Sequence, residues 1–439
     1  MLDSCLPDHL LRSAPDLERY LIDQRSPALA ALALPGEFVL PCAGLSVANV
    51  PATLAELLGA RLASASAPLP DAMWQDLAAG VRRVVCIILD AVGWTELRRL
   101  LEDEADLSLS RLARAGRFLP LTAVYPSTTT SALTTIWTGY TPAQHGLVGH
   151  MLYLRELGVV GDMLMFSPAG EHRRDQLLER GLDAATFLPV PGLAQALAEQ
   201  GVTTRVLINM SLAATSYSHM CFRGAAEVGR FITPADMAVQ LRQTLQAHRD
   251  ERLLLAAYLA ELDSIGHIEG PGGEAWRAEL RSLAYSLERE FLRGLSPEER
   301  AGTLVVLVSD HGQMVAPVTS VPLADHPELR RHLLLPITGS LRAAYLFAVQ
   351  GEAAEARAYL GERLGEQFAV VDSGDAVAAG LLGPGRPARE TACRTGDLVV
   401  MARDHFMLDY RRRDHPVLGA HAGTSAEEML VPFLMVRLD

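Results

Sequence analysis

The stretch Val84-Val85-Cys86-Ile87-Ile88-Leu89-Asp90 decides the fold. Its six consecutive apolar residues, most of them β-branched, are typical of a strand that is covered on both faces, as in a parallel sheet. In an open α/β sheet, ligands bind in the crevice outside the carboxyl ends of the strands, so Asp90 is a candidate site residue. Taken alone, Asp90 is better explained as a cap of the next helix. The functional interpretation therefore depends on whether the same arrangement recurs.

A second apolar run, residues 253–260, leads into Asp263 and His267. These two residues are four apart, so one helical turn would place both side chains on the same face, as a shared metal ion requires. Tyr258 lies on the same run, where a core aromatic residue is the simplest interpretation.

A third apolar run, residues 303–308, is followed by Ser309-Asp310-His311-Gly312. Adjacent residues on a strand point to opposite faces, so Asp310 and His311 can reach one ion only if the backbone turns there. Gly312 makes such a turn easy.

The last element of the pattern is His421, in Gly419-Ala420-His421-Ala422-Gly423, just before a final apolar run at residues 429–436. We expect most of the thirteen histidines to be surface or core residues, but His267, His311 and His421 each lie beside the end of a predicted strand. Three aspartates and three histidines supply six oxygen and nitrogen ligands without a thiolate. This set is enough for two divalent ions, and zinc fits it best, with manganese or another divalent metal as alternatives.

The order of the predicted elements indicates the fold class. Strands that alternate with helices predict an α/β fold with a doubly wound, mostly parallel central sheet flanked by helices, together with a smaller α+β insertion or lid. Local predictions include a helix capped by Asn49, a helix over residues 95–115 and a strand over 118–124. The predicted organisation is an N-terminal helical and irregular extension packed on the core (1–80), a catalytic core (81–313 and 415–439) and the insertion (314–414).

Composition limits the partners. The formal net charge of −13 disfavours a nucleic-acid polymer or an anionic membrane as the chief partner, because both bind basic surfaces. The chain contains no lysine, which excludes a Walker-type phosphate-binding lysine. Its apolar stretches are too short to span a membrane, and its first residues do not resemble a secretory signal. The five scattered cysteines predict neither a disulfide framework nor a thiolate metal site, and we expect a cytoplasmic protein.

Together the motifs resemble the alkaline phosphatase superfamily, most closely its nucleotide pyrophosphatase/phosphodiesterase-like (type I phosphodiesterase) branch. The resemblance runs from about Val84 to the C-terminus, with residues 314–414 weakly covered. It is carried by five motifs in the family's order: LDAVGW, VYPSTTTSALTTIWTGYTPAQHG, YLAELDSIGHIEGP, VLVSDHG and HAGTSAEEMLVP.

The resemblance implies an alkaline phosphatase-like fold and two metal sites of three protein ligands each: Asp263, His267 and His421 at one, and Asp90, Asp310 and His311 at the other. It also implies a threonine nucleophile that approaches the second metal. Composition cannot choose among the hydroxyls of residues 127–131. The family pattern places the nucleophile three residues after a proline and nine before a Thr-Gly pair, and Pro126 and Thr138-Gly139 both select Thr129.

The chain also departs from the branch. An asparagine that commonly follows the nucleophile by three residues is replaced by Ala132, and a Phe-Pro pair is replaced by Thr130-Ser131. Because one phosphoryl donor is missing, we consider three substitutes further along the chain, His150, Tyr153 and Arg155, although each is better explained as a structural or surface residue. Tyr258, five residues before Asp263, is a fourth substrate-binding candidate, because it matches a tyrosine that is common near the substrate in the branch; a core aromatic explains it equally well.

The resemblance predicts a metal-dependent phosphohydrolase that cleaves phosphodiester or pyrophosphate bonds of a small phosphorylated substrate, such as a nucleotide, through a phospho-threonine intermediate at a two-metal site. The alternatives are a phosphomonoesterase or phosphonate hydrolase with the same site. The alternative outside enzymes is a metal-containing binding protein that has lost turnover.

Overall fold

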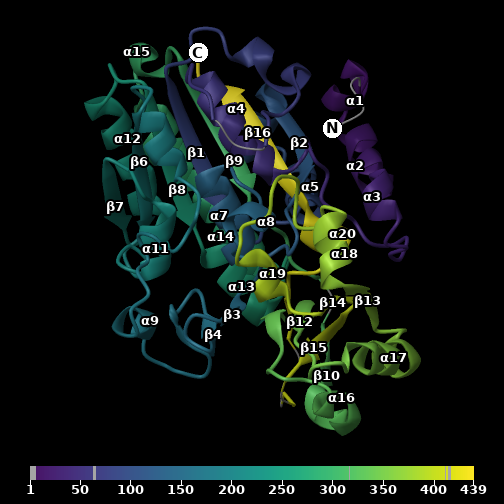
Figure 1. The fold of residues 1–439 in the computed structure, drawn as a ribbon. Coiled ribbons are helices and arrows are strands. Elements are labelled where there is room, and N and C mark those ends of the chain that lie inside the picture. Colours follow the sequence, from purple (N-terminus) through teal and green to yellow (C-terminus); the bar gives the residue numbers. More distant parts are fainter. Residues whose placement is uncertain (1–5, 63–65, 316, 411, 414–416) are drawn as a thin grey trace.

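The computed structural model describes residues 6–62, 66–315, 317–410, 412–413 and 417–439. Its centre is a seven-stranded sheet with the order β2-β16-β9-β1-β8-β6-β7 (Figure 1). Only β16 runs antiparallel to its neighbours, so the predicted doubly wound, mostly parallel sheet is confirmed. The strands are β1 (Arg83–Leu89), β2 (Arg117–Thr122), β6 (Thr203–Asn209), β7 (Glu227–Phe231), β8 (Leu253–Leu259), β9 (Thr303–Ser309) and β16 (Leu430–Arg437).

Strand β1 contributes to two hydrophobic cores, one on each face of the sheet. Because successive strand residues point to opposite faces, Val84, Cys86 and Ile88 lie in one core and Val85, Ile87 and Leu89 in the other. The first core includes residues of α4 (Val50–Leu57), α7 (Thr129–Thr138) and α10 (Leu193–Ala198). The second includes residues of α5 (Trp94–Asp103), α12 (Pro234–Ala247) and α14 (Glu274–Ser286).

A second seven-stranded sheet has the order β13-β14-β12-β11-β3-β4-β5, and all its pairs are antiparallel. It draws its strands from two separate parts of the chain: β3 (Met151–Leu154), β4 (Val159–Asp162) and β5 (Ser167–Pro168) from one, and β11 (Thr338–Ser340), β12 (Ala343–Leu346), β13 (Phe368–Asp372) and β14 (Leu398–Ala402) from the other. The sheet thus joins the predicted insertion to β3, β4 and β5, which lie in the segment predicted from the sequence to belong to the core. Asp414, where that insertion was expected to end, lies outside the described residues.

Further elements complete this part of the molecule. Strands β10 (Thr319–Pro322) and β15 (Phe406–Asp409) form a small parallel pair, and α16 (Pro327–Arg331) and α17 (Ala353–Leu364) lie beside the second sheet (Figure 1). The other helices are α1 (Asp8–Arg12), α2 (Ala14–Asp23), α3 (Pro27–Ala30), α6 (Ser108–Ala115), α8 (Pro142–His145), α9 (Gln176–Glu179), α11 (Ser216–Cys221), α13 (Glu261–Glu269), α15 (Pro297–Arg300), α18 (Ser373–Ala378), α19 (Thr391–Thr395) and α20 (Ala426–Met429).

Two local predictions are wrong in detail. Asn49 does not cap α4: its Oδ1 accepts a hydrogen bond from the Ser46 N–H at 3.1 Å, because a 3₁₀ turn that Ser46 caps precedes the helix. Residues 95–115 form two helices, α5 and α6, rather than one. At the break, the Ser110 hydroxyl donates to the Glu104 carbonyl oxygen at 2.7 Å. This side-chain contact satisfies a carbonyl group that a continuous helix would have bonded through its backbone.

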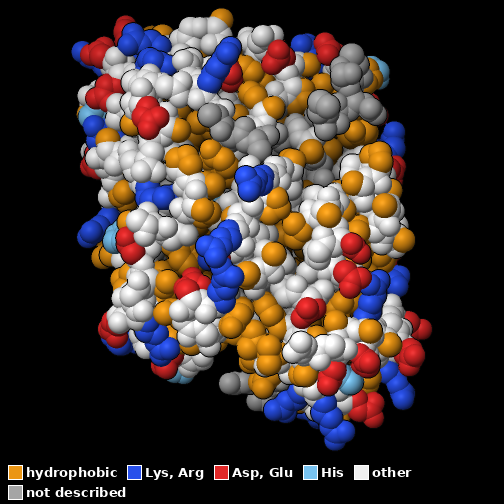
Figure 2. Space-filling view, in the orientation of Figure 1, with side chains coloured by type: hydrophobic (Ala, Val, Ile, Leu, Met, Phe, Trp, Pro, Cys, Tyr) orange, Lys and Arg blue, Asp and Glu red, His pale blue; other side chains and the backbone are white. Residues whose placement is uncertain are grey.

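None of the helices in the described part of the chain is long and apolar enough to cross a membrane. The four cysteines of the described residues are free, and Cys5 lies outside them. Figure 2 shows hydrophobic side chains gathered near the middle of one face, between the part built on the central sheet and the part built on the second sheet.

Candidate active site

The register of the central sheet brings the predicted acids to one edge. Leu89, the last residue of β1, pairs with Leu259 on one side and with Ser309 on the other. The loops that follow these strands therefore start side by side. Ala91, directly after Asp90, has φ 57°, and Ala422, directly after His421, has φ 94°. Positive φ is costly for residues other than glycine, and such strain concentrates at functional sites.

Asp90, Asp310 and His311 form a buried group whose candidate ligand atoms all lie within 4.8 Å of one another. Each acid has one oxygen engaged and one oxygen without a hydrogen-bond partner among the described residues. Asp310 Oδ1 accepts from the N–H groups of His311 (2.9 Å) and Ala91 (3.2 Å), and its Oδ2 is unpartnered. Asp90 Oδ2 accepts from the Tyr258 hydroxyl, and its Oδ1 is unpartnered.

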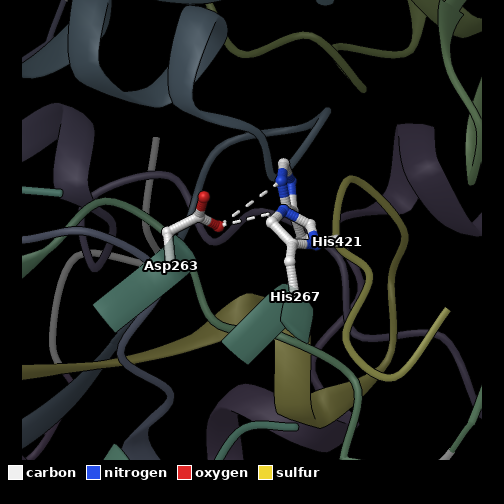
Figure 3. Close-up of side chains that lie close together, drawn as sticks. All are labelled: Asp263, His267 and His421. Atoms are coloured by element: carbon white, nitrogen blue, oxygen red, sulfur yellow. Dashed lines mark ion pairs between the residues drawn. The ribbon is translucent and has the colours of Figure 1, made fainter. Parts of the chain in front are cut away.

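Asp263, His267 and His421 form a second group with the same spacing (Figure 3). Helix α13 carries Asp263 and His267 one turn apart, as their spacing predicted, and the loop before α20 carries His421. Asp263 Oδ1 lies 3.3 Å from His267 Nε2 and 3.8 Å from His421 Nε2. The two groups adjoin, because the imidazole rings of His311 and His421 stack with centroids 4.2 Å apart.

All three histidines direct the same ring nitrogen toward the centre. Each Nδ1–H donates to a backbone carbonyl oxygen: His267 to Gly419 at 2.7 Å, His311 to Gly312 at 3.0 Å and His421 to Ser127 at 3.3 Å. This leaves each Nε2 facing the carboxylates. A backbone acceptor that fixes the ring orientation of a histidine is a common feature of metal ligands.

The pKa shifts of the acids reflect crowding of negative charge in a dry site. Burial raises the pKa of Asp90 well above its ordinary value, and the carboxylates of Asp310 and Asp263 raise it further. Burial also raises the pKa of Asp310. For Asp263, burial acts in the same direction, but the hydrogen bond with His267 and the charge of His421 outweigh it and lower the pKa to about 2. Buried carboxylates without enough positive charge favour binding of a cation.

The donor set fits two divalent metal ions. Carboxylate oxygens, two of them unpartnered, and three histidine Nε2 atoms converge in two adjoining groups, and no cysteine takes part. Carboxylate and imidazole donors of this kind suit zinc and manganese.

Thr129 lies next to the first group. Its Oγ1 is 3.2 Å from His311 Nε2, and the residue is the first of α7. The first turn of a helix leaves backbone N–H groups without intrahelical partners, which suits an anionic group. The hydroxyl of Tyr217, on α11, lies 3.2 Å from the Thr129 carbonyl oxygen and 3.3 Å from that of Thr130, and so holds this turn in place.

Sequence reasoning missed Tyr217 and also Gln313. The Gln313 side-chain amide donates to Asp263 Oδ1 at 2.6 Å and thereby orients that carboxylate. A Cβ at Gly266 would lie 1.8 Å from Gln313 Oε1, so this contact needs glycine at residue 266. Gln313 follows the Asp310-His311-Gly312 motif directly, and that position was a usable signal. Tyr217 lies in a segment without any recognisable motif.

The four substrate-binding candidates separate in the structure. Tyr258 lines a cavity of about 170 Å³ that also contains Thr129. His150 lines a second cavity, of about 450 Å³, together with His267 and His421, and its Nε2 is 3.1 Å from Asp162 Oδ2.

The structure does not bring Tyr153 or Arg155 to either cavity. Tyr153 packs against Phe347 with ring centroids 5.3 Å apart, because β3 turns away into the second sheet. Arg155 forms an exposed ion pair with Glu390 at 2.8 Å. Ala132 is fully buried in the core and offers no donor.

Comparison with known families gives one match. A model of the family described as type I phosphodiesterase / nucleotide pyrophosphatase matches residues 84–424, which covers most of the chain. No curated protein matches the sequence significantly.

Solved structures share the fold. Murine ectonucleotide pyrophosphatase/phosphodiesterase 5, solved as an inactive threonine-to-alanine variant in complex with AMP, is 16% identical with a TM-score of 0.60, over 81% of this chain and 88% of that chain. The human protein of the same name is 15% identical with a TM-score of 0.61, over 80% and 87%. Phosphonoacetate hydrolase from Sinorhizobium meliloti, solved with phosphonoacetate, is 18% identical with a TM-score of 0.58, over 80% and 89%.

Proposed function

Because the chain belongs to the type I phosphodiesterase/nucleotide pyrophosphatase family of the alkaline phosphatase superfamily, we propose that it hydrolyses phosphodiester or pyrophosphate bonds through a phospho-threonine at Thr129. The chain is a hydrolase of phosphoric esters, and its family is metal-dependent. The ligands in our proposal are Asp263, His267 and His421 for one divalent ion, and Asp90, Asp310 and His311 for another, with zinc as the best candidate.

One observation carries this proposal: the hydroxyl of Thr129 lies 3.2 Å from His311 Nε2, at the point where the two acid and histidine groups adjoin. The Thr129 hydroxyl thus lies beside a candidate site for a Lewis-acidic metal ion and belongs to the first residue of a helix. The inactive variant of the murine neighbour, in which a threonine is replaced by alanine, agrees with a threonine nucleophile in this fold.

The reaction would proceed by two displacements. Two divalent cations, when bound, would lower the pKa of the attacking hydroxyl and stabilise charge on the attacking and leaving oxygens. Thr129 Oγ1 gives up its proton to solvent and attacks phosphorus, the bond from phosphorus to the leaving oxygen breaks, and the leaving oxygen departs with that electron pair and takes up a proton from solvent. A water molecule then attacks phosphorus and gives up one proton, the bond from phosphorus to Oγ1 breaks, and Oγ1 takes up a proton to restore the Thr129 hydroxyl. The first turn of α7, held by Tyr217, orients the phosphoryl oxygens.

The contacts of Arg155 bear on the choice between diesters and monoesters. A monoester carries one more negative charge and needs an extra cationic donor. Arg155 does not supply it, because it pairs with Glu390 at the surface. Phosphonate hydrolysis is the second candidate function, since one neighbour in the same fold was solved with phosphonoacetate.

The test compares purified protein with its Thr129→Ala variant, each loaded with zinc or manganese. The substrates are bis(4-nitrophenyl) phosphate, 4-nitrophenyl phosphate and phosphonoacetate. We expect the diester to be hydrolysed fastest and Thr129→Ala to lower kcat by about a thousandfold or more. Metal content, measured by mass spectrometry, should stay the same, because the six ligands are unchanged.

Thr130→Ala is the matched control, since Thr130 is a buried neighbour on the same turn whose Oγ1 has no hydrogen-bond partner among the described residues. Normal turnover by Thr129→Ala would contradict the nucleophile assignment. A preference for phosphonoacetate would favour the second candidate function, and metal binding without turnover of any substrate would favour a binding protein.

A further inference from the structure

The cavity that contains Thr129 also has an apolar wall. Asp90, Thr129, Tyr258 and Asp263 form its catalytic side. The apolar residues that line the cavity come from several elements and include Leu133, Leu164, Ile208, Leu212 and Phe222. A group attached to phosphorus would therefore extend from the reacting centre onto an apolar surface.

The volume of this cavity suits a small group of that kind. A cavity of about 150 Å³ lined by apolar side chains holds one benzene molecule. The cavity here measures about 170 Å³, which is sufficient for one ring or a short acyl chain. A nucleoside has a base as well as a sugar and needs more room. The space beside Thr129 thus favours a one-ring substituent.

Arg174 is the single cationic residue among the described residues that line the cavity. It is exposed, whereas Asp90, Thr129 and Tyr258 are buried, so it lies at the mouth and they lie at the base. Its Nη1 donates to the Leu164 carbonyl oxygen at 2.9 Å. No carboxylate of the described part of the chain lies within ion-pair distance of it, so its charge is available to a ligand.

The position of Arg174 is fixed by its neighbours. Asp175 accepts a hydrogen bond from the Ser216 N–H at 3.3 Å, and its own N–H donates to the Met165 carbonyl oxygen at 2.9 Å. These contacts tie the loop to the start of α11, which forms part of the cavity wall. Arg173, by contrast, is neutralised by Glu179 through two bonds of 2.6 and 2.7 Å and does not line the cavity.

We propose that Arg174 is a specificity-determining residue, which binds a carboxylate at the far end of a one-ring substituent carried by the phosphorus of the substrate. This inference rests on the function proposed above and defines its substrate class. A planar guanidinium matches a carboxylate in geometry as well as in charge, and the apolar lining of the cavity accommodates the ring. The preferred substrates are then phosphodiesters of small carboxylated aryl groups rather than of nucleosides.

The test uses three esters that share the 4-nitrophenolate leaving group and differ in the retained group, which is phenyl, 4-carboxyphenyl or 5′-thymidyl. Release of 4-nitrophenolate gives kcat/KM for the wild type, Arg174→Gln, Arg174→Lys and Arg173→Gln. We expect the wild type to prefer the carboxyphenyl ester over the phenyl ester by about tenfold or more, mainly in KM. Arg174→Gln should reduce this ratio to about one, Arg174→Lys should keep part of it, and Arg173→Gln should match the wild type.

Calorimetric binding of 4-carboxyphenyl phosphate and phenyl phosphate to metal-loaded protein provides a readout independent of turnover. Turnover of all three esters with no carboxyphenyl preference, or an unchanged ratio in Arg174→Gln, would overturn the role of Arg174. Faster hydrolysis of the thymidyl ester than of both aryl esters would overturn the one-ring substrate class. Absence of turnover with an intact, Arg174-dependent binding preference would instead count against the proposed hydrolase reaction.

Discussion

The ion pair between Arg342 and Glu428 joins the second sheet to the loop that carries His421. Arg342 Nε and Nη2 donate to the two oxygens of Glu428 at 2.7 and 2.9 Å, and the side chains are 1% and 0% exposed. Glu428 also accepts from the N–H groups of Gly423 (2.8 Å) and Ser425 (3.2 Å). We predict that Arg342→Met destabilises the protein strongly and weakens metal binding by the group that contains His421.

The magnitude follows from burial. Removal of one partner from a buried ion pair leaves an uncompensated charge and costs about 3–5 kcal/mol. Glu428 would keep two backbone donors, so we expect a loss of about 3 kcal/mol, at the lower end of that range. Removal of the second charge as well, in Arg342→Met with Glu428→Gln, should cost less than the sum of the two single changes, because each single change leaves the other group unpaired.

The assay is urea unfolding followed by circular dichroism, with zinc content measured in parallel. Arg412→Met is the matched control, because Arg412 pairs with Asp325 at 2.6 Å but is 75% exposed. Exposed pairs contribute at most about 1 kcal/mol. A loss below about 1 kcal/mol for Arg342→Met, or strict additivity in the double variant, would refute the reasoning.

Two other predictions concern the region around α7. The Tyr217→Phe change removes the hydroxyl that holds the first turn of the helix. We expect steady-state kinetics to show that kcat falls about tenfold for every substrate while KM is nearly unchanged. An unchanged kcat would show that Thr129 does not depend on this contact. Burial lowers the pKa of His145 to about 3, so the unfolded state binds a proton that the folded state does not between pH 6.5 and 3. The stabilisation by neutral His145 is complete above pH 6.5 and is lost as the pH falls, by about 2 kcal/mol at pH 5. The free energy of unfolding of His145→Gln, measured by urea unfolding, should therefore depend less steeply on pH over this interval. Equal pH slopes of the unfolding free energy for both proteins would contradict this prediction.

The central sheet could be predicted from sequence because its strands are long and continuously apolar. In β1, β8 and β9 the run of apolar residues marks the whole strand, and parallel pairing then places the residues after each strand at one edge. The side chains of Asp90, Asp310 and His311 meet there for that reason. That Asp263 and His267 share one face of a helix could be predicted from their spacing of four residues. No similar rule places Thr129 among five adjacent hydroxyls, and the family pattern was needed to choose it.

The second sheet could not be predicted in the same way. Its strands are short, and β11 pairs with β3 through a contact between Gly339 and Met151, which are far apart in sequence. Tyr153 and Arg155 were candidates for a substitute donor because they follow the nucleophile along the chain, but the pairing of β3 carries them away from the site. Arg174 and Tyr217 reach the cavity through tertiary contacts that leave no local pattern.

The two proposed metal groups depend on different parts of the molecule. Asp90, Asp310 and His311 are fixed by the central sheet, whose register is set by long buried strands. His421 instead lies on a loop held by Glu428, which in turn requires Arg342 of the second sheet. Any movement of the second sheet would therefore disturb the group of Asp263, His267 and His421 before it disturbed the other. Metal affinity at that group should therefore report on docking of the second sheet, whereas Asp90, Asp310 and His311 directly follow strands of the central sheet.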